Sequence, residues 1–92
     1  MDKIIFSDEI AWQIVPDKSF AYACNMKTRK YYEFEDTELM IWMCIAENVG
    51  ITLTNLQNKV ANYYNVSLET VVDDVSDFVK SLFKTGLVKH GE

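Results

Sequence analysis

The sequence contains few of the residues that catalysis and metal binding require. Among 92 residues there is a single histidine, His90, which is the third residue from the end. None of the three glycines has the spacing of a phosphate-binding loop. The two cysteines, Cys24 and Cys44, do not form a Cys-x-x-Cys pair, so neither a disulfide framework nor a zinc site is expected. These shortages predict no catalytic residue, no metal and no cofactor, and therefore no enzyme.

Long apolar runs are also missing. Charged residues or asparagine interrupt every apolar run within about 12 residues, whereas a membrane-spanning helix needs roughly 20. The first residues lack the apolar segment and the cleavage site of a signal peptide. We therefore expect a cytoplasmic protein without a membrane segment. A hydrophobic content of 49% and a charged content of 25% suit one small globular domain, residues 1–92.

The net charge of −5 disfavours a nucleic-acid partner, because binding to phosphates depends on lysine and arginine. The charges are unevenly distributed. A basic cluster contains Lys27, Arg29 and Lys30, and two acidic groups contain Glu33, Glu35, Asp36 and Glu38 and then Glu69, Asp73, Asp74 and Asp77. Each cluster is either a solvated turn or helix start, or part of a surface that meets a charged partner.

Three segments alternate in the manner of β-strands. They are residues 10–15, 20–24 and 30–34. A turn at residues 16–19 follows the first segment, and a polar stretch connects the second with the third, so two hairpins give a three-stranded antiparallel sheet. In the third strand Tyr31 and Glu33 share one face, and Tyr32 and Phe34 share the other. We expect the face of Tyr32 and Phe34 to be the drier one.

After the third strand the apolar spacing changes to three and four residues, which predicts three helices. The first begins near Asp36 and ends before Gly50, the second lies between Thr52 and Asn65, and the third follows Ser67 and ends at Gly86. The apolar positions of the third helix cover about 140° of its circumference, wider than the usual stripe. One flank of this helix therefore either faces a partner or is enclosed by the rest of the domain.

The helical spacing also predicts which side chains form the core. The apolar stripe of the first helix includes Trp42 and ends at Val49, and the stripe of the second ends at Tyr63 or Tyr64. We expect Trp12 of the first strand to join Trp42 in the core.

The order of elements predicts an α+β fold, a winged helix-turn-helix with a three-stranded antiparallel sheet followed by three helices. This outline makes a DNA-binding domain or an oligomerisation domain an alternative function. The recognition helix of a DNA-binding protein would be the third helix, whose four acids outnumber two lysines and would repel phosphates. An aromatic strand that leads directly into a helix instead offers an open strand edge, which an extended peptide can pair with.

An ordered set of residues resembles the PqqD-like family, whose members recognise peptides in pathways that modify ribosomally made peptides. The set comprises Lys30, Tyr31, Tyr32, Glu33, Phe34, Thr37, Ile41, Trp42, Thr52, Leu53, Leu56, Asn65, Val66, Ser67, Asp74, Val75, Phe78, Val79, Leu82, Gly86, Leu87 and Val88. Family members often have asparagine at the position of Glu35, so Asp36 or Thr37 is expected to cap the helix here. The ending Gly86-Leu87-Val88 is more similar to lasso-peptide members than to pyrroloquinoline quinone members.

The resemblance implies a protein that binds the leader segment of a precursor peptide by β-strand addition. It also implies that the leader is presented to a separate modifying enzyme, which is a leader peptidase, a cyclase or a radical SAM enzyme. The strand would be supplied by Lys30, Tyr31, Tyr32, Glu33 and Phe34, and the helical wall by Val71, Asp74, Val75 and Phe78.

Several of these side chains have an ordinary structural interpretation beside the functional one. Tyr31 is either an aromatic contact for the leader or a sheet-face residue, and Phe78 is either a pocket floor or part of the core. Asp74 either pairs a lysine or arginine of the leader or is a solvated helix acid. The basic cluster would attract an acidic leader. An unpaired strand edge also permits a homodimer.

Overall fold

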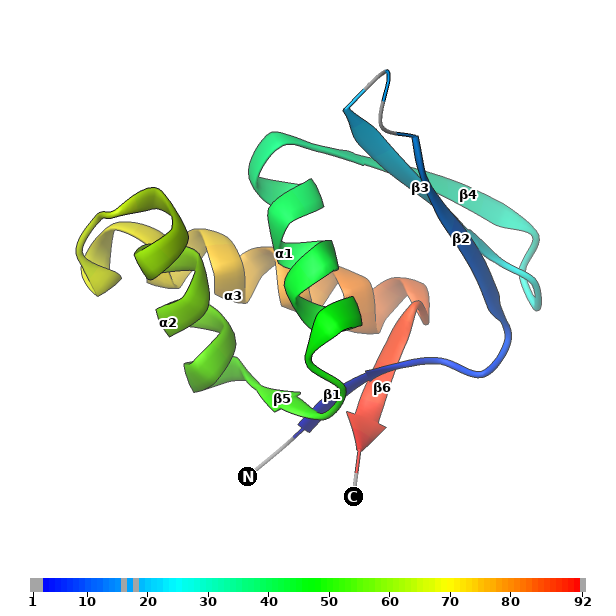
Figure 1. The fold of residues 1–92 in the computed structure, drawn as a ribbon. Coiled ribbons are helices and arrows are strands. Elements are labelled where there is room, and N and C mark those ends of the chain that lie inside the picture. Colours follow the sequence, from blue (N-terminus) through cyan, green and yellow to red (C-terminus); the bar gives the residue numbers. More distant parts are fainter. Residues whose placement is uncertain (1–2, 16, 18, 92) are drawn as a thin grey trace.

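The computed structural model describes residues 3–15, 17 and 19–91 and has nine regular elements in this part of the chain (Figure 1). The strands are β1 (Lys3–Phe6), β2 (Ile10–Val15), β3 (Phe20–Asn25), β4 (Lys30–Glu35), β5 (Ile51–Thr52) and β6 (Val88–Gly91). The helices are α1 (Asp36–Glu47), α2 (Leu53–Tyr64) and α3 (Leu68–Thr85). Helix α1 lies between α2 and the sheet that contains β2, β3 and β4 (Figure 1).

The three strands predicted from the sequence form an antiparallel sheet in the order β2-β3-β4. Opposite β2, Ala23 of β3 pairs with Trp12, and opposite β4 the same residue pairs with Tyr32. Ala21 and Ala23 have no exposed surface, so the middle strand presents small side chains to the core. The predicted sheet and its strand boundaries are confirmed to within one residue. In the predicted turn at residues 16–19, Pro16 and Lys18 lie outside the described residues.

A second antiparallel sheet, in the order β5-β1-β6, was not predicted from the sequence. Strand β1 is its middle strand, with Ile4 paired to Ile51 of β5 and to His90 of β6. Ile4 is 2% exposed and therefore belongs to the core. This sheet joins strands from both ends of the described chain, and its middle strand β1 contributes Ile4 to the core.

The three helices are confirmed, and capping residues account for the start of α2 and for the ends of α2 and α3, whereas Ser67 at the N-cap of α3 makes no side-chain capping hydrogen bond. The Thr52 hydroxyl accepts a hydrogen bond from the Asn55 amide at 3.2 Å, which begins α2. Asn65 and Gly86 take left-handed conformations, with φ of 56° and 78°, and end α2 and α3. In the described part of the chain, no helix has both the length and the hydropathy that a membrane crossing requires.

The core contains Trp42, as predicted, with no exposed surface. Its ring stacks on Phe6 at a centroid distance of 4.5 Å. The prediction for Trp12 was wrong, because this ring contacts the edge of the cluster and remains 37% exposed. Trp12 lies on β2, an outer strand of its sheet, and no other described strand covers the second side of β2.

Two predicted ends of apolar stripes were also wrong. Helix α1 ends at Glu47, so Val49 lies beyond the helix and is 87% exposed. Tyr63 and Tyr64 are both exposed, because Val60 and Ala61 already complete the buried face of α2.

A buried amide fixes the β3–β4 hairpin to the C-terminal end of α3. The Asn25 Nδ2 atom donates to the carbonyl of Thr85 at 2.8 Å, and its Oδ1 atom accepts from the amides of Lys27 and Thr28 at 3.0 and 3.2 Å. A Cβ atom at Gly86 would lie 2.9 Å from the Asn25 Nδ2 atom, so the close approach requires glycine there. The hairpin and α3 are thereby held in a fixed relation on either side of the site described next.

Candidate functional site

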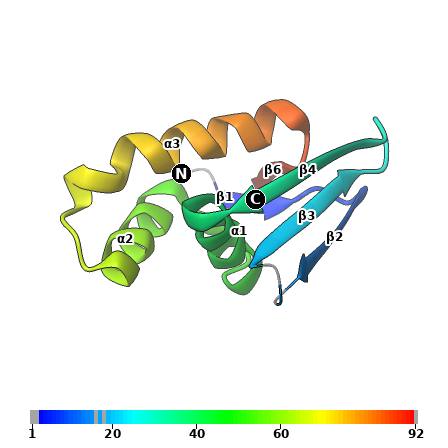
Figure 2. The same cartoon turned by 90° about the horizontal axis from the view of Figure 1, so that it is seen from above.

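In the described part of the chain, strand β4 has one edge without a neighbouring strand. Within the described residues it pairs only with β3, since the N-terminal strand β1 pairs with β5 and β6 instead. Alternate residues of such an edge direct their amide and carbonyl groups outward, where another strand can bind them. Of the three strands in this sheet, β4 is the nearest to α3 (Figure 2). The open edge therefore lies toward a helix.

The two faces of β4 differ as the alternation predicts. Phe34 is 5% exposed, and its ring packs against Trp42 at 4.8 Å and against Phe78 of α3 at 5.3 Å. Tyr32 is half-buried on the same face, whereas Tyr31 is 73% exposed and Glu33 is exposed on the other. The Phe34–Phe78 contact joins the strand to the helix that it faces.

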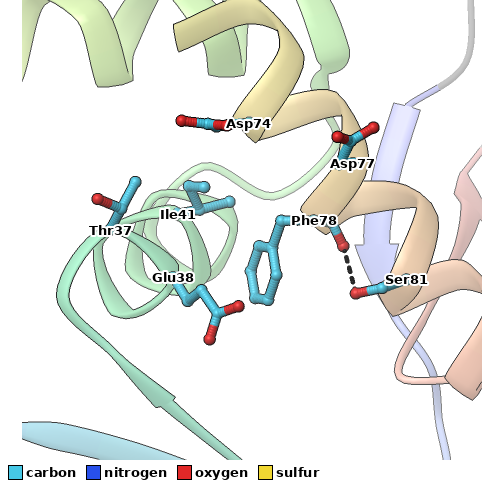
Figure 3. Close-up of a pocket in the computed structure, with 7 residues that line it drawn as sticks. All are labelled: Thr37, Glu38, Ile41, Asp74, Asp77, Phe78 and Ser81. Carbon is cyan, nitrogen blue, oxygen red and sulfur yellow. Dashed lines mark hydrogen bonds between the residues drawn. The ribbon is translucent and has the colours of Figure 1, made fainter.

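A pocket of about 410 Å³ opens between α1 and α3 (Figure 3). Its lining residues come from the first turns of α1 and from the middle of α3, and they are Thr37, Glu38, Ile41, Asp74, Asp77, Phe78 and Ser81. The Phe78 ring points into the space between the two helices (Figure 3). The Ser81 hydroxyl donates to the carbonyl of Phe78 at 2.8 Å and so remains on the wall of the pocket.

The direct junction of β4 and α1 brings the α1 residues to this pocket. Strand β4 ends at Glu35 and α1 begins at Asp36, with no loop between them. Asp36 has a φ of 52°, a left-handed conformation that costs roughly 1 kcal/mol and that aspartate adopts more readily than most residues. Glu35 occupies the N-cap position and makes no side-chain capping hydrogen bond. The expectation that the cap moves to Asp36 or Thr37 was therefore wrong.

The helical residues singled out from the sequence separate into two groups. Asp74 and Phe78 line the pocket. Val75 has no exposed surface and Val71 is 8% exposed, so both side chains pack into the core beneath α3. The backbone of residues 30–34 lies along the open edge.

Sequence reasoning did not assign the remaining pocket residues to the site. Asp77 lies three positions after Asp74, and Ser81 lies four positions after Asp77, so helical spacing places both residues on the same side of the helix as Asp74. Glu38 and Ile41 carried no such signal, because their place depends on how α1 packs against α3.

The site is charged at both ends. Glu38, Asp74 and Asp77 are exposed around the pocket, and none of them forms an ion pair with another described residue. At the opposite end of β4 the basic cluster of Lys27, Arg29 and Lys30 is exposed on the hairpin, likewise without an ion pair in the described part of the chain. An extended ligand on this edge therefore meets acidic groups at one end and basic groups at the other.

No protein-family model matches the sequence, and no curated protein matches it either. Among solved structures, TbiB1 in complex with the TbiA(beta) leader peptide is similar to this chain, with a TM-score of 0.80. The similarity covers 92% of this chain and 94% of TbiB1, at 20% sequence identity. It establishes the fold and confirms the predicted winged α+β architecture.

Proposed function

We propose that the protein binds the leader segment of a precursor peptide as an added strand on β4 and presents it to a separate modifying enzyme. The observation that carries this proposal is the unpaired edge of β4 beside α3, while the N-terminal strand is held elsewhere by β5 and β6. The similar fold of TbiB1 was solved with a leader peptide, which supports a peptide ligand for this chain.

In this proposal the backbone and the side chains have separate tasks. The backbone of residues 30–34 forms a ladder with the leader, and each hydrogen bond contributes roughly 0.5 to 1.5 kcal/mol net. Tyr31 offers an exposed aromatic surface, and Asp74 and Phe78 contact leader side chains from α3. Val71 and Val75 act from the core by fixing the position of α3.

The chemistry takes place on the partner enzyme, a leader peptidase, a cyclase or a radical SAM enzyme. The described residues offer a binding edge and a pocket wall, and the role proposed for them is non-catalytic. The Gly86-Leu87-Val88 ending favours a pathway of the lasso-peptide type, and the cytoplasm is the compartment in which such a precursor would be met.

The two rival functions are less well supported. In a winged-helix DNA-binding protein α3 would approach the phosphates, and here Glu69, Asp73 and Asp74 are exposed on this helix. A homodimer through β4 would use the same edge, so self-association would compete with the leader rather than add to its binding.

The test is a titration of isotope-labelled protein with the leader of the precursor peptide encoded beside it, followed through backbone amide shifts. The largest shifts are expected at residues 30–34 and around Asp74 and Phe78. Asp74→Lys should weaken binding, whereas Asp73→Lys, an equal charge change outside the pocket, should leave it nearly unchanged. Shifts confined to a surface away from β4 and α3 would contradict the proposal.

A further inference from the structure

Two groups of opposite charge lie at the two ends of β4, and the strand itself carries the exposed carboxylates of Glu33 and Glu35. The basic cluster, Lys27, Arg29 and Lys30, is at the hairpin, and the acidic pocket with Glu38, Asp74 and Asp77 is where β4 passes into α1. The six residues of β4 span roughly 20 Å, about two and a half times the screening length at physiological salt. Each group therefore acts mainly on the part of a bound peptide that is next to it.

The pocket combines an apolar floor with an acidic rim. Ile41 and Phe78 are buried, 1% and 8% exposed, while the three carboxylates around them are exposed. Lysine and arginine have the matching shape, since each has an apolar stem and a cationic tip. A cation above the Phe78 ring gains a further attraction from the aromatic face. Among the described residues, no group of three acidic, histidine or cysteine side chains is arranged to hold a metal ion. The pocket therefore suits a long cationic side chain.

The direction of the peptide follows from strand pairing. Antiparallel pairing is slightly more stable per residue than parallel pairing. Since β4 runs from the hairpin to α1, an antiparallel partner runs from the pocket to the hairpin. Its residue in the pocket thus precedes its residue at the hairpin by roughly five to seven positions.

Resting on the proposed function, we propose that the bound peptide carries a lysine or arginine that enters the pocket between α1 and α3, followed about five to seven residues later by an aspartate or glutamate opposite the basic cluster. The backbone ladder is indifferent to sequence, so this charge pair supplies selectivity and fixes the register and direction of the peptide.

The experiment selects binders of the full chain from displayed random dodecapeptides and measures the affinities of synthetic copies. Selected peptides should be enriched in the basic-then-acidic pair at this spacing. Replacing the basic residue with norleucine or citrulline should weaken binding about threefold to tenfold, as expected for partly exposed charges. Replacing the acidic residue with its amide should have a smaller effect of about twofold.

Matched variants locate the two contacts. In Asp74→Asn/Asp77→Asn the penalty for removing the peptide's basic charge should fall to within twofold, whereas Asp73→Asn, an exposed acid of the same helix outside the pocket, should retain it. In Lys27→Gln/Arg29→Gln/Lys30→Gln the peptide's acidic residue should lose its effect, whereas Lys84→Gln should preserve it.

The outcomes distinguish the two proposals. Selected peptides that shift the β4 amides without any charge pattern, or with the acidic residue first, would overturn the charge-pair inference and leave leader binding intact. A penalty that persists in Asp74→Asn/Asp77→Asn would likewise overturn it. Failure of every selected peptide to shift the β4 amides would overturn leader binding, and the charge-pair inference with it.

Discussion

In the sheet β2-β3-β4 the strands follow one another along the chain and are joined by hairpins, whereas the sheet β5-β1-β6 brings together strands from distant parts of the sequence. The first sheet has an outer strand, β4, directed toward α3. The second sheet uses the N-terminal strand β1 as its middle strand, paired on both sides. Both sheets have three strands, but they differ in how the strands are connected along the chain and in which strand lies at the edge.

The comparison teaches how an open strand edge is maintained. A free N-terminal strand near a free edge is a natural candidate to pair with it. Among the described strands, β1 pairs with β5 and β6 and does not occupy the β4 edge. We therefore refer to β5-β1-β6, whose middle strand places Ile4 in the core, as the structural sheet, and to β2-β3-β4, to whose edge we propose that the leader adds, as the binding sheet.

The largest loss of stability is expected for a substitution in β1, the middle strand of the structural sheet β5-β1-β6. Ile4→Ala should lower the free energy of unfolding by about 3 kcal/mol, because Ile4 is 2% exposed and a cavity would remain. Ile5→Ala is the matched control, since Ile5 is only half-buried on the same strand, and about 1 kcal/mol is expected. Urea unfolding measures both. Equal losses would show that β1 does not belong to the core.

The second largest loss of stability is expected for a substitution of Asn25, which connects the binding sheet β2-β3-β4 with α3. Asn25→Ala should cost about 2 kcal/mol, because the carbonyl of Thr85 loses its side-chain donor and two hairpin amides lose their acceptor. Asn58→Ala is the control, since among the described residues its exposed amide donates only to the carbonyl of Thr54 in the same helix, and a change below about 0.5 kcal/mol is expected. If both variants unfold at the same urea concentration, the hairpin is not fixed to α3 by this amide.

A kinetic difference of about tenfold is expected between the two thiols. Burial raises the pKa of the Cys44 thiol, and the carboxylate of Glu47 adds to the rise against an opposing effect of Lys59. Cys44 therefore has less thiolate near pH 8 and should react with a disulfide reagent about ten times more slowly than half-buried Cys24. The single variants Cys24→Ser and Cys44→Ser separate the two rates.

The raised pKa of Cys44 also affects stability. The buried neutral thiol stabilises the fold fully below the ordinary pKa of a thiol, and this contribution is lost as the pH rises through the raised value. In the labelling experiment, a faster reaction of Cys44 than of Cys24 would contradict the predicted order of rates and would mean that α1 opens more readily than the sheet β2-β3-β4.

The smallest effect is expected for the ion pair that joins β6 to the residues after β1. Lys89 contacts Asp8 at 2.9 Å, but the two side chains are 45% and 85% exposed. Lys89→Ala should therefore change the free energy of unfolding by about 0.5 kcal/mol or less, with a slightly larger change at low salt. Lys84→Ala provides the control for removal of one exposed positive charge. A loss above about 1.5 kcal/mol would give this pair a structural role that its exposure does not suggest.

Local signals in the sequence were sufficient for much of the fold. The strands 10–15, 20–24 and 30–34 and the three helices were predicted because alternation, capping residues and turns lie within a few positions of one another. The sheet β5-β1-β6 was missed because strands of two to four residues pair across almost the whole chain, and no local pattern records such a register. The exposure of Trp12 and Tyr63 was predicted wrongly for a related reason, since it depends on where neighbouring elements end.

Part of the candidate site was also predictable from local patterns in the sequence. The edge strand, Asp74 and Phe78 follow from alternation, helical spacing and the family resemblance. Glu38 and Ile41 belong to the pocket only because α1 packs against α3, which the sequence does not specify locally. The burial of Val71 and Val75 likewise became clear only when the sheet and the helices were assembled.

The most direct test compares the two outer strands of the binding sheet by amide hydrogen exchange, with and without the leader peptide. Outward-facing amides of β4 should exchange rapidly in the free protein and become protected when the leader is added, while those of β2 should continue to exchange. Protection that appears on β2, or on neither strand while the leader is bound, would contradict the central claim that β4 is the edge to which the leader adds.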